Sequence, residues 1–79
     1  MGTEGSIVSE LAAFVRGARL REGLTQAELA HLARVGRRFV SDLEGGTKST
    51  LRLDKVAAVL AVFGRRLAIV DVREADGGG

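Results

Sequence analysis

Residues 25–46 read TQAELAHLARVGRRFVSDLEGG, and this stretch decides the fold. Thr25 and Glu28 stand at the spacing of a capping box, which begins a helix. Residues 34–36 interrupt the apolar period, and a second short helix follows until the two glycines at 45–46, which suit a left-handed C-terminal residue. The stretch therefore predicts two short helices joined by a tight turn. Their inward apolar positions are Leu29, Ala30, Ala33, Val40 and Leu43.

Amphipathic helices are predicted on both sides of this pair. Ser6 is a residue type that caps the first of them, and Gly23 ends it. A polar loop at residues 47–51 precedes the last one, which Gly64 closes. At helical spacing, the apolar positions are Ile7, Leu11, Phe14, Val15 and Ala18 in the first and Leu53, Val56, Ala57, Leu60 and Phe63 in the last.

Residues 66–72 read RLAIVDV and alternate in the manner of a β-strand. The pattern offers no second strand, and an unpaired strand leaves backbone groups that invite pairing. Two copies related by a two-fold axis can pair such strands antiparallel. The pattern therefore predicts a homodimer, and the alternative is an extended edge packed on the chain's own helices. Residues 1–5 and 73–79, which are small, polar and glycine-rich, are predicted to be disordered tails.

Composition limits the chain to one small domain. It has 79 residues, no cysteine and His31 as its one histidine, so neither a metal site nor a cofactor is expected. A domain this short gains stability from oligomerisation. We expect a cytoplasmic protein, since no apolar run reaches the roughly 18 to 20 residues of a membrane span and no secretory leader is indicated. We do not expect an enzyme, because no nucleophile, acid and base converge in the pattern.

Positive charge is concentrated in residues 16–38. This segment holds six arginines and two acidic residues, although the formal net charge of the whole chain is only +2. Such a distribution is typical of a surface that binds the phosphates of nucleic acids. Arginines on helices are also common on faces that meet only water, and that alternative stays open.

Two short helices joined by a tight turn place the second helix in the major groove of DNA while the first crosses the backbone. Here the small Ala30 allows the helices to approach, and Val35 fills the space under the turn. The segments LTQAELA and VGRRFVSDLEGG resemble the Cro/repressor (XRE) helix-turn-helix family over residues 20–63. The stretch TLRLDKVAAVLAVFGRRLAIVDV resembles the HipB-like antitoxins within that family.

The resemblance implies a mainly α, four-helix, lambda-repressor-like domain over residues 6–72, with one C-terminal β-strand at 66–72 that pairs across a dimer. It also implies a bacterial, nucleoid-associated repressor of a toxin-antitoxin operon, which binds a palindromic operator in double-stranded DNA and a HipA-like kinase toxin. The alternatives are a stand-alone regulator of the same family and a pure protein-interaction module that neutralises a partner. A kinase-like gene beside this one would favour the antitoxin.

The resemblance also implies DNA contacts. Gln26 is expected to contact a phosphate and to brace the recognition helix. Arg37 and Arg38 are expected to reach base edges, where an arginine can bind guanine O6 and N7. Ser41 is expected at a phosphate or a base, and Lys48 at a phosphate. The full expected DNA-binding set is Thr25, Gln26, Gly36, Arg37, Arg38, Ser41 and Lys48.

Less specific interpretations of these residues stay open. Gln26 could be only a residue of the first helical turn, and Arg37 and Arg38 could both contact phosphates alone. Phe39 either belongs to the core or contacts a thymine methyl group. His31 is expected to be an exposed helix residue.

Three positions depart from the family pattern. Arg34 stands where glycine is usual in the turn, so a residue with a Cβ takes a left-handed conformation, at about 1 to 2 kcal/mol, or the turn is reshaped. Gly36 replaces the usual serine cap of the recognition helix and is a weaker cap. Ser49 stands where a proline is common before the last helix.

Overall fold

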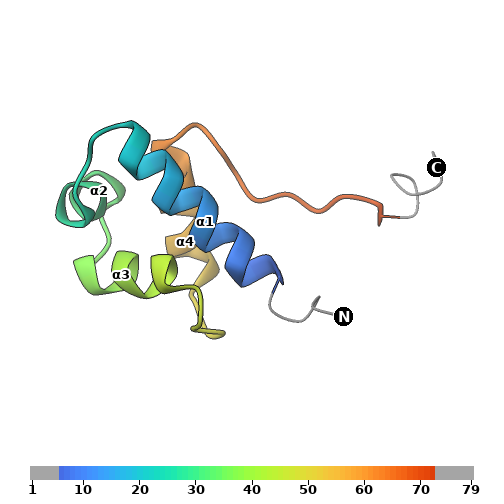
Figure 1. The fold of residues 1–79 in the computed structure, drawn as a ribbon. Coiled ribbons are helices and arrows are strands. Elements are labelled where there is room, and N and C mark those ends of the chain that lie inside the picture. Colours follow the sequence, from blue (N-terminus) through green and yellow to red (C-terminus); the bar gives the residue numbers. More distant parts are fainter. Residues whose placement is uncertain (1–5, 73–79) are drawn as a thin grey trace.

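The computed structural model describes residues 6–72, which form four helices connected by short loops (Figure 1). These are α1 (Ser6–Arg21), α2 (Gln26–Ala33), α3 (Arg37–Gly45) and α4 (Leu53–Val62). Helix α3 packs against both α1 and α2, and α2 also packs against α4. The predicted mainly α fold with four helices is therefore confirmed. The tails predicted at residues 1–5 and 73–79 lie outside the described residues.

All four helices contribute to a single apolar core. Its largest fully buried side chains are Leu29, Leu43, Val15, Val40, Val56 and Val59. Next to it, the rings of Phe14 and Phe63 meet edge to face, with centroids 6.3 Å apart. The stretch that decides the fold thus supplies the centre of the core, and the flanking helices complete it.

The apolar pattern is wrong at two helix ends. Ile7 and Leu53 are predicted on the inner faces, but they are 60% and 70% exposed. Both lie in the first turn of their helices. Val59, which the spacing did not select, is fully buried. Ser6 is the first residue of α1, and its role as a cap stays a prediction.

The predicted capping box at the start of α2 is confirmed. The amide of Glu28 donates to Thr25 Oγ1 at 3.0 Å, and the amide of Thr25 donates to a carboxylate oxygen of Glu28 at 2.8 Å. At the other end of the motif, Gly46 has φ of 74° and closes α3. A Cβ at Gly46 would lie 3.2 Å from the Cβ of Ala12, so this glycine also permits close packing against α1.

The turn between α2 and α3 keeps a left-handed residue. Arg34 has φ of 60° and ψ of 42°, and it is the one non-glycine residue with positive φ in the described chain. The following amide, of Val35, donates to the carbonyl oxygen of Ala30 at 3.0 Å, as helix C-caps do. The strained conformation expected at Arg34 is therefore present. Gly36 begins α3 without a side-chain cap, as the sequence predicts.

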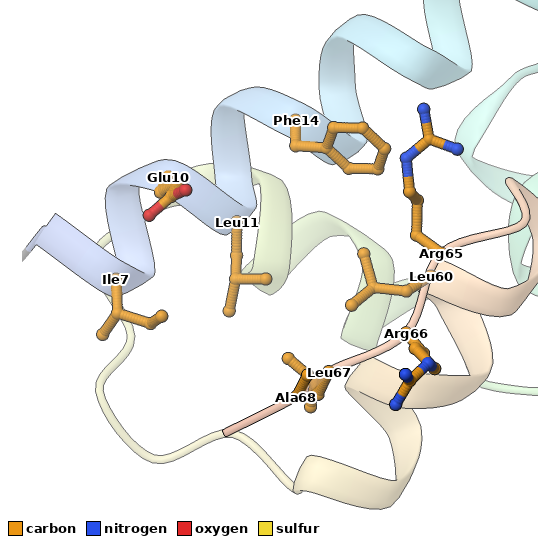
Figure 2. A pocket seen from close by; sticks show the side chains of 9 residues that line it. All are labelled: Ile7, Glu10, Leu11, Phe14, Leu60, Arg65, Arg66, Leu67 and Ala68. Atoms are coloured by element: carbon orange, nitrogen blue, oxygen red, sulfur yellow. The ribbon is translucent and has the colours of Figure 1, made fainter. Parts of the chain in front are cut away.

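The predicted C-terminal strand is not confirmed in the single chain. No segment within residues 6–72 is paired as a strand, and residues 66–72 extend away from the helices (Figure 1). A strand needs a partner for its backbone groups, and the helices offer none. Only the start of this segment lies against them, where Leu67 and Ala68 line a groove of about 280 Å³ with Ile7 and Phe14 (Figure 2). We call residues 66–72 the C-terminal arm.

Two further findings concern the described residues as a group. None of the helices within residues 6–72 has the length and apolar character needed to cross a membrane. In the same part of the chain, no three histidine or acidic side chains gather in a way that could hold a metal ion.

Candidate nucleic-acid interface

Helix α3 has one face fixed in the core and one face turned to solvent. Val40 and Leu43 are fully buried and hold the inner face in place. Arg37, Arg38 and Ser41 are exposed on the outer side. Ser41 lies three and four residues after the two arginines, so the three side chains are neighbours on the helix surface. Across residues 6–72, the side chain of neither arginine takes part in a hydrogen bond or an ion pair. Both guanidinium groups are thus available to a ligand.

A buried ionic cluster fixes α3 against α1 and α2. Arg19 donates to both carboxylate oxygens of Glu44, with Nε at 2.6 Å and Nη2 at 2.9 Å, and its Nη1 donates to the carbonyl oxygen of Leu24 at 2.9 Å. The Arg19 and Glu44 side chains are 9% and 3% exposed. Such a bidentate pair sets orientation as well as distance, because both groups are planar. Glu44 is one of the last residues of α3, so the cluster fixes the direction of this helix.

Gln26 joins the same cluster from the first position of α2. Its side-chain amide donates to Glu44 Oε1 at 3.1 Å. Gln26 therefore connects α2 directly to α3. This contact corresponds to the bracing of the recognition helix that the family resemblance implies. Its contact with a phosphate remains a proposal. Thr25, just before it, uses its hydroxyl in the capping box and is otherwise exposed.

The ionisation of Glu44 is coupled to this cluster. Burial by itself would raise the pKa of the carboxyl group. The hydrogen bonds from Arg19 and Gln26, with the positive charges of Arg19 and Arg16, outweigh burial and hold the pKa of Glu44 below its ordinary value of 4.5. Glu44 is therefore ionised at neutral pH.

The sequence analysis missed the ion pair of Arg19 and Glu44. It therefore assigned one arginine too many to the predicted basic surface. Arg19 is among the six arginines of the predicted basic surface, but it is 7% exposed and bound to Glu44. The two residues are 25 positions apart, so no local pattern pairs them. No local signal in the sequence pairs them, and a buried carboxylate requires a cation that only the tertiary structure identifies.

The structure places the remaining expected residues around α3. Lys48 is exposed in the loop after it, with Nζ 3.4 Å from Asp42 Oδ2. Both groups are partly exposed, at 49% and 28%, and exposed pairs of this kind contribute only about 0 to 1 kcal/mol. The pair with Asp42 therefore constrains Lys48 only weakly. Phe39 packs against the core, which supports the first of its two interpretations, and His31 is exposed as expected.

Comparison with known proteins places this geometry in context. Residues 10–71 match the family described as "Helix-turn-helix domain". The chain is also 42% identical over 62 residues to an "Uncharacterized HTH-type transcriptional regulator y4mF" of Sinorhizobium fredii, and the alignment covers 78% of this chain and 80% of that protein. Both matches span α2, the turn at Arg34 and α3.

Proposed function

The chain belongs to the helix-turn-helix family, and we propose that it is a sequence-specific repressor of transcription that inserts α3 into the major groove of duplex DNA. The observation that carries this proposal is the outer face of α3. It presents Arg37, Arg38 and Ser41, while Val40 and Leu43 and the Arg19–Glu44 pair hold the opposite face. A rigid helix with unengaged arginines can read base edges without first breaking internal contacts.

Different roles follow for the residues around α3. Arg37 and Arg38 are suited to bidentate contact with guanine, and Ser41 to a base or a phosphate. Thr25, Gln26 and Gly36 stand where α2 and α3 begin, the helix ends whose backbone amides suit phosphate oxygens. Lys48 adds a mobile charge for the DNA backbone. This proposal makes the chain a cytoplasmic DNA-binding protein and not an enzyme.

Base contacts and phosphate contacts should separate in a binding experiment. Arg37→Ala or Arg38→Ala should weaken binding to a selected operator duplex by about 1 to 3 kcal/mol and relax the preference at one base pair in each half-site. Lys48→Ala should weaken operator and scrambled duplexes nearly equally and make the salt dependence shallower by about one unit of slope. Binding isotherms at several salt concentrations measure both effects.

The control for lost charge is Arg65→Ala, because Arg65 lies over the ring of Phe14 and not on α3. Arg65 also lines the groove beside the C-terminal arm, so sedimentation first shows that this variant has the same oligomeric state as wild type. This variant should bind both duplexes almost as wild type does. If Arg37→Ala and Arg38→Ala lower affinity for operator and scrambled DNA by equal factors, neither arginine reads a base, and the proposed roles are wrong.

We propose that the protein acts as a homodimer whose arms pair antiparallel about a two-fold axis. Ile69, Val70 and Val72 are 102%, 72% and 71% exposed in the single chain, and an extended apolar segment of this kind is a template for strand pairing. The groove between Ile7, Phe14 and Leu67 continues this apolar surface (Figure 2). A symmetric dimer would present two copies of α3 to a palindromic operator.

The finer assignment that we propose is a HipB-like antitoxin, which represses its own operon and binds a HipA-like kinase toxin. It is supported by the resemblance of residues 50–72, where α4 continues into the apolar arm. Co-expression with a kinase-like product of the neighbouring gene should give a complex that co-purifies and binds the operator more tightly. A well-folded kinase that does not associate would favour a stand-alone regulator. If the wild-type protein binds no DNA, the remaining interpretation is a pure protein-interaction module that neutralises a partner.

A further inference from the structure

The turn between α2 and α3 carries a side chain where the other helix ends have glycine. Within residues 6–72, the glycines with positive φ are Gly23, Gly46 and Gly64. They lie just after the ends of α1, α3 and α4. The corresponding residue after α2 is Arg34, with φ of 60°. The turn that leads into α3 is therefore the one helix end in this part of the chain that combines a left-handed conformation with a Cβ.

The backbone of Arg34 closes α2 in a way that needs no side chain. Its amide donates to the carbonyl oxygen of His31 at 3.2 Å, and the next amide, of Val35, donates to that of Ala30 at 3.0 Å. Glycine would form the same bonds without steric strain. A cation near a helix C-terminus is stabilised by the helix dipole, but this gain is smaller than the cost of the left-handed conformation. The fold therefore does not explain the side chain of Arg34.

The guanidinium group of Arg34 is available to a ligand. Arg34 is exposed, and across residues 6–72 its side chain takes part in no hydrogen bond or ion pair. Strain of this kind in a backbone is concentrated at positions that bind ligands. A guanidinium without an internal acceptor is suited to an anion, and to phosphate in particular. The strained turn thus points to an anion outside the chain.

Arg34 lies beside the end of α3 that the proposed function places in the major groove. It stands three residues before Arg37, so their Cα atoms are at most about 11 Å apart. The major groove is about 12 Å wide, and phosphates line both of its edges. Because Arg34 precedes Gly36, the N-cap of α3, it lies outside the helix that reaches the base edges. The edge of the groove is therefore the part of the duplex closest to Arg34.

We propose that Arg34 binds a backbone phosphate at the edge of the groove that α3 enters, and that this contact offsets the strain of the turn. The inference rests on the proposed DNA binding and adds a residue to it. Glycine, which is usual at this position in the family that the sequence resembles, offers no side chain for such a contact. The turn of the free protein is thus more strained than a glycine turn, and the gain appears only in the complex with DNA.

Arg34→Gly and Arg34→Asn remove the charge and keep the backbone conformation, since both residues accept positive φ. Each variant should weaken the selected operator and a scrambled duplex by similar factors. The slope of log affinity against log salt should become shallower by about 0.9 for each bound protomer, so the ratio of wild-type to variant affinity falls about 3- to 4-fold per protomer between about 50 and 200 mM salt. Arg34→Lys, which keeps the charge, should retain the wild-type slope.

Thermal unfolding of the same variants tests the argument from strain. Arg34→Gly should unfold at the wild-type temperature or a few degrees above it, so its weaker DNA binding cannot come from unfolding. A lower unfolding temperature would show that the side chain of Arg34 stabilises the chain itself, and the argument from strain would be wrong.

The binding data separate this inference from the proposed function. If wild type binds DNA and both uncharged variants bind it with the same affinity and slope, the Arg34 contact is wrong and the proposed function stands. Weaker binding to the operator alone would mean that Arg34 reads a base, and would overturn the phosphate contact. If wild type binds neither duplex, the proposed function and the Arg34 contact are both wrong.

Discussion

Replacing Glu44 with glutamine should lower the free energy of unfolding by about 3 to 5 kcal/mol, because it leaves the guanidinium of Arg19 buried without a counter-charge. Glutamine has nearly the shape of glutamate, so the change removes charge and not volume. Native domains of this size have a total stability of about 4 to 12 kcal/mol, so the loss is about a quarter of the total or more, and it unfolds a large share of the molecules if the total lies near the lower limit. Urea unfolding followed by circular dichroism measures it.

The control for this effect is the Arg19→Met/Glu44→Gln variant. It removes both charges, keeps an amide beside Gln26 and should recover most of the lost stability, because a buried pair is costly mainly when it is broken on one side. If the double variant is as unstable as the two single changes added together, the pair is not coupled. The Arg19–Glu44 cluster would then not be what holds α3.

The same pair predicts an acid limit to stability. The pKa of Glu44 is lower in the folded chain than in the unfolded chain, so the unfolded state binds the proton more readily. The contribution of the pair is therefore fully present above the ordinary pKa of about 4.5 and is lost as the pH falls through the lowered value. Wild type should lose this part of its stability below about pH 4.5, and Glu44→Gln should not.

Charged residues in the arm should dissociate the dimer and weaken operator binding by about 10²- to 10⁴-fold, the gain that a second linked site usually provides. We expect this result for the Ile69→Glu/Val70→Glu variant, because both side chains would lie in the paired strands. Sedimentation at micromolar concentration should show a dimer for wild type and a monomer for the variant. Ending the chain at Gly64 should have the same two effects.

Ala61→Glu is the matched control for added charge, since Ala61 is exposed on α4 and outside the arm. It should remain dimeric and bind the operator as wild type does. An arm variant that stays dimeric with unchanged affinity would show that the exposed apolar arm is not the interface between copies.

Local rules predicted the parts of this fold that depend on neighbouring residues. The capping box of Thr25 and Glu28 and the glycine that closes α3 each follow from residue types within four positions of one another, whereas the left-handed Arg34 is expected from the family resemblance. Helix periodicity predicted four helices, but at Ile7 and Leu53 it could not show where the neighbouring elements end.

The missed features all require contacts between distant segments. Arg19 meets Glu44 across 25 positions, so no local pattern joins the two residues. The arm predicted as a strand is an exposed segment in the single chain, because the described helices offer no partner for its backbone groups. Sequence patterns therefore locate α3, and tertiary structure supplies the residues that hold it.

Selection of bound duplexes from a random-sequence pool tests DNA reading by α3 most directly. Wild type should enrich a two-fold symmetric sequence with guanine in each half-site and half-site centres one helical turn, about 10 base pairs, or a multiple of that apart. The Arg37→Ala/Arg38→Ala variant should lose the enrichment of those guanines while it still retains duplex DNA at low salt. A wild-type pool with no enriched sequence, or the same enriched sequence from both proteins, would contradict the role of α3.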